Sequence, residues 1–334
     1  MKLGAACNCF VFLFSLEPQQ RQSKWARRTA KRRERTDQLL AKIVPPTFLG
    51  CPSLDNVELK VLDAPQVDWE NHPNLDPEEG GRLKRGSHRA RRKRRAIEAF
   101  LHASRAVVDD EANRLIVDAG SGAGNLAIPM AGFFGSVLAI DVNAIALHHL
   151  SLRAPRVQTL CADLAAPIEL PPATAAVCSL HACGAASDLA IRLATNHRVP
   201  FIVSPCCTAK AITARVGFAL NDRYRLATSF QRSAAPLDVT YPRSTWLDRF
   251  LTDETDYTLL AKTADVGLGP QTPTEQVRHQ RLAKLVIELD RLAHVVEEKD
   301  YSVRLLRIMD HGGYGKPEIL VGVPCEDKDL LERL

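Results

Sequence analysis

The stretch IVDAGSGAGN, residues 116–125, decides the fold of this 334-residue chain. An apolar run reaches Asp118, and glycines then occupy every second position: Gly120, Gly122 and Gly124. Glycine permits a tight turn and a close approach of the backbone to a ligand, at which the N–H groups of a following helix would point. The dinucleotide-binding pattern G-x-G-x-x-G would need glycine where Asn125 stands. The stretch therefore predicts a ligand-binding turn between a strand and a helix, of a kind other than the dinucleotide fingerprint.

Apolar strands alternate with helical stretches from this point towards the middle of the chain. The pattern predicts strands at 114–120, 136–141, 157–163, 175–181 and 198–205. Strands separated in this way by helices form a parallel sheet that is covered on both faces. Near the C-terminus YSVRLLRIM and PEILVGVP are separated by the glycine-rich DHGGYGK, which predicts an antiparallel hairpin. The expected fold is a seven-stranded, mostly parallel α/β sheet.

The periodicity also divides the chain into three parts. Residues 1–80 show no sustained periodicity, so we expect a mostly irregular, partly basic extension with a helix over 21–43. Residues 82–207 and 300–325 are expected to form the sheet domain. Between them, residues 208–299 are expected to form a helical insertion that includes one long amphipathic helix.

Composition and cysteine usage indicate the compartment. The chain is 46% hydrophobic and has no apolar run long enough to span a bilayer. Its nine cysteines are unevenly spaced, and several lie in apolar strands, which is typical of reduced thiols. The first residues, MKLGAACNCFVFLFSL, resemble a signal peptide but lack a small-x-small cleavage site. We expect a cytoplasmic or nuclear protein without a transmembrane segment; the sequence predicts no oligomeric state.

Two basic segments stand out against an acidic remainder. Residues 21–35 hold eight Lys or Arg and one Glu, and residues 82–95 hold nine Lys or Arg and no acidic residue. Together they carry +16, and since the whole chain carries +5 the remainder carries −11. Such segments usually contact phosphates, either of nucleic acid or of a membrane surface, and here RNA is the expected partner. Solvated linkers or a nuclear-import signal are the alternative.

Two more aspartates end predicted strands, at the edge where ligands bind in open parallel sheets. Asp141 ends the second strand and Asp163 the third. With these aspartates, the pattern D-x-G-x-G-x-G resembles the S-adenosylmethionine (SAM) loop of class I methyltransferases. The resemblance implies SAM as cofactor, with Asp141 on the ribose and Asp163 beside the adenine. It implies these cofactor-binding residues: Asp118, Gly120, Ser121, Gly122, Gly124, Asp141, Val142, Asp163 and Leu164.

A second likeness lies at the ends of the fourth and fifth strands. SLHACGAASDLA (179–190) and FIVSPCC (201–207) are similar to the LHxCG…D and Cys-Cys motifs of the methyltransferase domain in glutathione S-transferase C-terminal-domain-containing proteins. The tRNA 2′-O-methyltransferases that carry a CHHC finger have related forms. RRKRRAIEAFL, YPRS and PEILVGVP add to the likeness, which covers about residues 85–325. This chain lacks room for a glutathione-transferase-like N-terminal domain and lacks the finger, so the likeness does not imply a substrate.

Four interpretations remain open for His181, Cys183, Cys206 and Cys207. H-x-C and C-C together offer four zinc ligands, although the spacing is not a standard one and we expect no metal. One cysteine could instead attack a base as a thiolate. His181 could act as general base in an acceptor pocket, which we favour. Finally, Gly184 could make a plain turn, with Ser187 or Asp188 capping the next helix and the thiols merely packed.

The sequence thus predicts a SAM-dependent methyltransferase that acts on RNA. Methyl transfer requires the donor and acceptor to be held in line, and a base when the acceptor is protonated. A protein or a small molecule is an alternative acceptor. A methyltransferase fold that binds RNA without catalysis is another alternative, disfavoured by the three aspartates and the full glycine loop. A nucleotide-dependent oxidoreductase is disfavoured by the glycine spacing.

Overall fold

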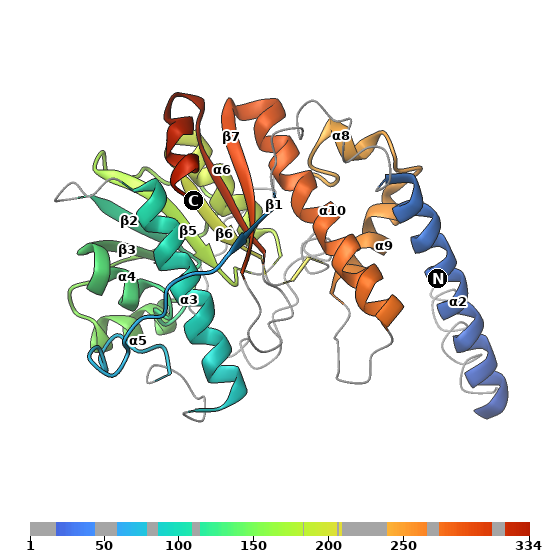
Figure 1. Ribbon diagram of the computed structural model, residues 1–334, viewed down its shortest axis with the longest axis horizontal. Helices are drawn as coiled ribbons and strands as arrows, with labels where there is room; N and C mark the ends of the chain where they lie inside the picture. The colour runs from blue at the N-terminus through green and yellow to red at the C-terminus, as the bar shows by residue number, and fades with distance from the viewer. Residues whose placement is uncertain are drawn as a thin grey trace, which may run out of the picture.

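The computed structural model describes residues 18–43, 59–78, 86–108, 114–182, 184–205, 207–208, 239–265, 274–308 and 318–334. These residues form an eight-stranded sheet of order β1-β7-β8-β6-β5-β2-β3-β4, flanked by helices (Figure 1). The strands are β1 Leu59–Leu62, β2 Leu115–Ala119, β3 Ser136–Asp141, β4 Gln158–Cys161, β5 Thr174–Leu180, β6 Phe201–Ser204, β7 Tyr301–Ile308 and β8 Glu318–Pro324.

The predicted seven-stranded sheet is confirmed as β2 to β8. The five strands β2 to β6 pair in parallel, and β8 lies antiparallel to both β6 and β7, as expected of the terminal hairpin. The eighth strand, β1, pairs in parallel with β7. It comes from the region that was expected to be mostly irregular, because four residues, LKVL, are too few to show a period. By pairing with β7, β1 covers backbone groups that would otherwise form an open sheet edge.

Helices cover both faces of the sheet, and alternate residues of β2 show how the core is divided. Leu115 and Val117 pack into the apolar cluster on the side of α6 and α10, whereas Ile116 packs into the cluster on the side of α3 and α4. The helices are α2 Pro18–Ile43, α3 His88–Val107, α4 Ala127–Phe134, α5 Ala144–Arg153, α6 Ala186–Asn196, α8 Thr245–Asp248, α9 Glu254–Ala264, α10 Thr274–Lys299 and the 3₁₀ helix η3 Cys325–Arg333. None of the helices in the described part of the chain combines the length and the apolar character that a bilayer crossing requires.

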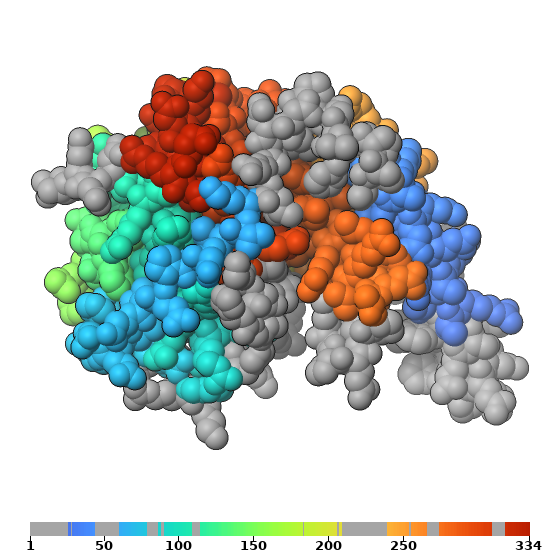
Figure 2. Space-filling model, viewed as in Figure 1, coloured from blue at the N-terminus to red at the C-terminus, as the bar shows by residue number. Residues whose placement is uncertain are grey.

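The region predicted as a helical insertion contributes α8, α9 and α10. Helix α10 packs against α9 and also against β7, so it belongs to the layer that covers the sheet. Helix α2 contacts both α9 and α10, and it forms the edge of the molecule opposite α4 and α5 (Figures 1 and 2). The helix expected over 21–43 therefore forms and is longer than expected at its N-terminus. The three domain boundaries drawn from the sequence stay a prediction.

Candidate active site

The glycine loop turns tightly between β2 and α4. Its three glycines all have positive φ, at 79°, 54° and 84°: Gly120, Gly122 and Gly124. The N–H groups of Gly120 and Ser121 donate to the Ile140 carbonyl of β3, at 2.8 and 3.1 Å. A Cβ atom on Gly124 would lie 2.3 Å from Cδ1 of Leu150. Both the backbone conformation and the packing against α5 therefore require glycine at position 124.

Asp141 is the last residue of β3, as the sequence predicted. Its carboxylate accepts from the N–H of Gly122 at 2.8 Å and from the N–H of Asn143 at 2.7 Å. The carboxylate thereby links the end of β3 to the glycine loop and to the N-cap of α5. Each of its oxygens has a second lone pair, so a half-buried Asp141 retains the capacity to accept hydroxyl protons of a ligand.

Asp118 lies below the loop rather than at the strand end. It is the fourth of five residues in β2, it is 1% exposed, and it accepts from the Ala127 N–H. Burial, with a further contribution from the nearby Asp141 charge, raises the pKa of Asp118 to about 7. Its Oδ2 atom has no hydrogen-bond partner among the described residues. The structure therefore places Asp118 at the buried base of the loop, linked to the first residue of α4, and its predicted contact with the cofactor stays a prediction.

The third aspartate follows its strand at a short distance. β4 ends at Cys161, and Asp163 comes two residues later, where it accepts from the Ala165 N–H at 2.9 Å. Leu164 is partly buried against the core, and the Val142 carbonyl accepts from the Cys161 thiol at 3.8 Å. Because Ala162 N–H donates to the Asp141 carbonyl at 3.1 Å, the segments that follow β3 and β4 lie side by side.

The segment that follows β5 contacts the glycine loop directly. The Ser179 hydroxyl donates to the Ala119 carbonyl at 2.8 Å. A Cβ atom on Gly120 would lie 3.2 Å from Cβ of Ala182. The predicted acceptor segment and the predicted cofactor loop are therefore adjacent, as a transfer between two bound molecules requires.

His181 has a strained position at the carboxyl edge of the sheet. It follows β5 with a φ of 63°, its side chain is exposed, and its N–H donates to the Ser204 carbonyl of β6 at 3.2 Å. A non-glycine residue in this conformation is uncommon, although histidine is among the residues that adopt it. An exposed imidazole beside the glycine loop fits the predicted role of His181 as general base, which stays a prediction.

The cysteines give less information. Cys207 is half-buried and follows Pro205 by two residues, whereas Cys183 and Cys206 lie outside the described residues. In the part of the chain that the structure covers, no cluster of His, Cys, Asp and Glu could hold a metal. Neither the zinc interpretation nor covalent catalysis by a cysteine is tested, and the expected absence of a metal stays a prediction.

The helix cap at Ser187 or Asp188, which belonged to the plain-turn alternative, does not form. Helix α6 begins at the N-cap Ala185 without a side-chain cap. Instead, the Ser187 hydroxyl donates to the Ala182 carbonyl at 2.5 Å, and the Asp188 carboxylate turns into the core towards Arg291. Arg291 on α10 donates to both oxygens of Asp188, so the carboxylate is engaged by a paired, charge-assisted contact.

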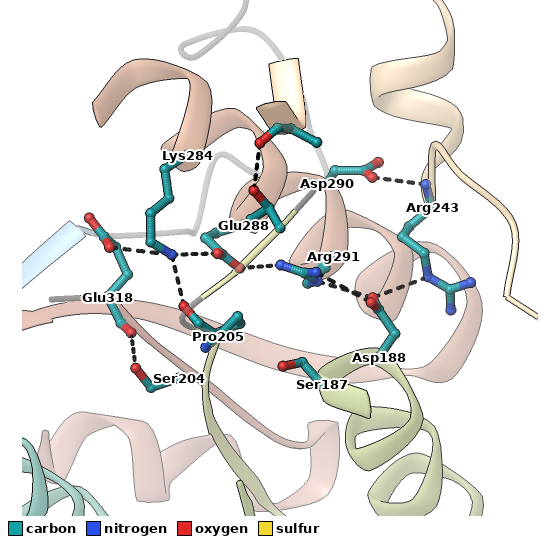
Figure 3. A network of polar contacts seen from close by, with 12 residues as sticks. Ser187, Asp188, Ser204, Pro205, Arg243, Lys284, Glu288, Asp290, Arg291 and Glu318 are labelled. Atoms are coloured by element: carbon teal, nitrogen blue, oxygen red, sulfur yellow. Dashed lines mark hydrogen bonds and ion pairs between the residues drawn. The ribbon is translucent and has the colours of Figure 1, made fainter. Parts of the chain in front are cut away.

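A buried polar network behind the two strand ends was missed from the sequence (Figure 3). Its members come from α6, α10, β8 and the segments around 205 and 241: Asp188, Pro205, Tyr241, Arg243, Lys284, Glu288, Arg291 and Glu318. One signal was available. Lys284, Glu288 and Arg291 interrupt the apolar face of the predicted long helix, and charged residues on such a face are buried only when paired.

The loop and strand ends suit the cofactor predicted from the sequence. A Cβ atom on Gly122 would have no heavy atom within 4 Å, so the loop backbone faces open space at this position. Asp141 stands beside that space and is held by two N–H donors. A carboxylate fixed in this way is the acceptor that a ribose diol requires. The residues present therefore fit SAM, with Gly122 and Asp141 as the contacts that the geometry supports best.

Comparison with known proteins agrees with this assignment. Residues 92–214 match a family model described as a methyltransferase domain. The glutathione S-transferase C-terminal domain-containing protein of Bos taurus is 26% identical over 303 residues, which are 84% of this chain and 42% of that protein. The Macaca fascicularis protein of the same name is 26% identical over 304 residues, with the same shares. This chain thus spans less than half the length of these relatives.

Two solved structures resemble the chain at low identity. An rRNA methylase from Streptococcus thermophilus has a TM-score of 0.27 at 18% identity, covering 42% of this chain and 84% of that one. The magnesium protoporphyrin IX methyltransferase ChlM from Synechocystis PCC 6803, solved with bound SAH, has a TM-score of 0.35 at 13% identity, covering 77% and 96%. The family match over residues 92–214 contains the glycine loop and the strand ends described above, so this part of the chain is similar to a methyltransferase domain.

Proposed function

We propose that the protein transfers a methyl group from SAM to RNA. The observation that carries the methyl transfer is the adjacency of two segments: the glycine loop anchored by Asp141, and the segment after β5 that carries His181. SAM supplies an electrophilic methyl group on a sulfonium, so the protein's task is to hold the acceptor in line and to remove a proton where the acceptor carries one. Asp141 and Gly122 hold the donor side, and His181 is the candidate base on the acceptor side.

The support for RNA comes from a basic groove between α2 and α9. The groove has a volume of about 400 Å³, and four cations, two hydroxyls and one leucine line it: Lys31, Arg32, Arg35, Lys262, Thr255, Thr258 and Leu259. No carboxylate contributes to this lining. Arg35 is paired with Asp253 and Asp256, whereas Lys31, Arg32 and Lys262 are exposed and form no ion pair with another described residue. Cations without acidic partners that line a groove are suited to a phosphodiester backbone.

The second basic segment, 82–95, offers fewer cations for RNA binding than its composition suggests. In its described part, two arginines already form ion pairs within the protein. Arg94 pairs with Asp76 and Glu78. Arg95 pairs with Asp63 and Glu98. Lys93 donates to the Pro77 carbonyl at 2.9 Å and to Oδ1 of Asn125 at 2.6 Å. These cations hold the 59–78 segment and the glycine loop against α3. We therefore assign the proposed RNA contact to α2 and α9.

Salt-dependent binding tests the RNA assignment. Each phosphate that a cation neutralises releases counterions, so affinity falls with salt by a slope of about 0.7 per contact on single strands. Changing Lys31, Arg32 and Lys262 together to Gln is expected to weaken binding of a single-stranded RNA and to reduce the salt slope by about 2. The affinity for SAM is expected to stay unchanged, because the groove lies apart from the glycine loop.

A control of equal charge is available on exposed residues elsewhere in the fold. The triple variant Arg156→Gln, Lys328→Gln and Arg333→Gln also removes three positive charges. It is expected to retain nearly the wild-type slope. If both triple variants lose the same amount of salt dependence in RNA binding, only net charge matters. If the variant of Lys31, Arg32 and Lys262 keeps the wild-type salt dependence, the groove is excluded as the RNA-binding surface. In either case the RNA acceptor would lose its support, and a protein or small-molecule acceptor would take its place.

A further inference from the structure

One face of α10 contacts the end of β6 and the start of α6, the helix that follows β5. Lys284 and Arg291 are seven residues apart with Glu288 between them, so the three side chains project from the same face. Lys284 Nζ donates to Oε1 of Glu288 at 2.6 Å, and Arg291 NH1 donates to Oε2 of the same carboxylate at 2.8 Å. Glu288 therefore bridges the two cations, and all three side chains are at most 2% exposed (Figure 3).

Each cation then contacts a different element: Lys284 the end of β6, and Arg291 the start of α6. Lys284 Nζ donates to the Pro205 carbonyl at 3.1 Å, directly after β6 and directly before Cys206 in the sequence. Arg291 donates to both oxygens of Asp188, at 3.1 and 3.3 Å, near the start of α6. Asp188 also accepts from the Tyr241 hydroxyl at 2.8 Å. Asp188 near the start of α6 and Pro205 after β6 are thus both tied to α10 (Figure 3).

The charges of the network balance, but burying them costs desolvation free energy. Lys284 also pairs with Glu318 at 3.5 Å. Burial alone would lower the pKa of Lys284, but Glu288 and Glu318 outweigh this effect and raise it, so the amine stays charged. Buried ion pairs are generally no more stabilising than apolar residues of the same volume. Stability alone therefore does not account for this cluster, and a fully paired buried network of this kind rigidifies the segments that it joins.

We propose that Lys284, bridged through Glu288 to Arg291 and Asp188, is a positioning residue that sets the Pro205 strand end relative to the segment carrying His181. The link between the two segments is direct, because the His181 N–H donates to the Ser204 carbonyl. A displacement on the order of 1 Å at a reacting group can lower the rate about 100-fold. The kinetic part of this inference rests on the proposed methyl transfer.

A charge-balanced double variant separates positioning from folding. Lys284→Met alone removes a buried cation, so that only Arg291 remains beside Glu288 and only Arg307 beside Glu318, and this imbalance can prevent folding. Lys284→Met with Glu288→Gln removes one charge of each sign and leaves the Arg291–Asp188 pair in place. With SAM and total cellular RNA as substrates, this variant is expected to lose about 100-fold in kcat, while its thermal midpoint and SAM affinity stay close to wild type. In hydrogen exchange, peptides containing His181 are expected to exchange faster, and those containing Gly120 and Ser121 are not.

The control variant changes Arg304, which, like Lys284, donates to one backbone carbonyl and one carboxylate but lies on the other side of the sheet domain. Arg304 of β7 donates to the Leu331 carbonyl and to Glu332 of η3, so it too joins a backbone carbonyl and a carboxylate. Arg304→Met with Glu332→Gln is expected to leave kcat and the exchange at His181 unchanged. Wild-type kcat and exchange in the Lys284 double variant would overturn the inference. If the wild-type protein itself methylates no RNA, the proposed function fails, and the exchange comparison still decides whether Lys284 positions the strand end.

Discussion

Asp118→Asn is expected to keep a nearly constant free energy of unfolding between pH 4 and pH 7, as far as residue 118 determines it. The wild-type protein is expected to lose on the order of 4 kcal/mol over the same range. Burial raises the pKa of Asp118 from 3.8 to about 7. In this window the unfolded state has released its proton while the folded state still holds it. The unfolded state therefore binds fewer protons, and the free energy of unfolding falls as the pH rises. Above pH 7 both states are ionised and the contribution no longer changes.

Denaturant unfolding of both proteins at several pH values measures this effect. Burial also raises the pKa of Asp290, to about 6, so the informative quantity is the difference between Asp118→Asn and wild type rather than either curve alone. The variant is expected to be the more stable protein at pH 8. Asp329→Asn, at an exposed position, should follow the wild-type curve. Parallel curves for wild type and Asp118→Asn would show that Asp118 ionises normally in the folded state.

Asp141→Ala is expected to weaken SAM binding by about 1.5–3 kcal/mol, or roughly 10- to 150-fold in Kd. The substitution removes the acceptor for the ribose and also the acceptor of the Gly122 and Asn143 N–H groups. Asp141→Asn keeps one oxygen acceptor without the charge, so its loss should be intermediate. Isothermal titration calorimetry on proteins shown to be folded measures all three affinities. Unchanged affinity in Asp141→Ala would remove Asp141 from the cofactor site, and Asp329→Ala serves as the control.

The sheet could be predicted from the sequence because its signals are local. Each parallel strand is a short apolar run next to a helical stretch, and the glycines at 120, 122 and 124 mark a turn that only glycine can make. Strand β1 could not be predicted, since a four-residue strand is defined by its pairing with β7, some 240 residues away in the sequence. Asp141 was placed correctly at a strand end, whereas Asp118 lies inside its strand and below the loop.

In the candidate site, too, local features could be predicted from the sequence and tertiary pairings could not. His181 could be predicted at the carboxyl edge because it follows an apolar strand. The pairing of Asp188 with Arg291, and of Arg94 with Asp76, joins residues that only the tertiary fold brings together. Composition alone made the 82–95 segment resemble a phosphate-binding arm. In its described part, however, Arg94 and Arg95 pair with carboxylates, three of which lie in the region expected to be irregular: Asp63, Asp76 and Glu78. Local patterns thus indicate which residues reach the edge, but not which charges remain available there.

The most direct test of the account is transfer of a labelled methyl group. Purified protein is incubated with methyl-labelled SAM and total RNA from cells that lack the protein, and the label is then traced to individual nucleosides by mass spectrometry. The account predicts label in a defined nucleoside, loss of that label with Asp141→Ala, and strong loss with His181→Ala although that variant still binds SAM. Label that resists ribonuclease and stays with protein, or no label in RNA from a protein that binds SAM, would contradict the proposed RNA methyl transfer.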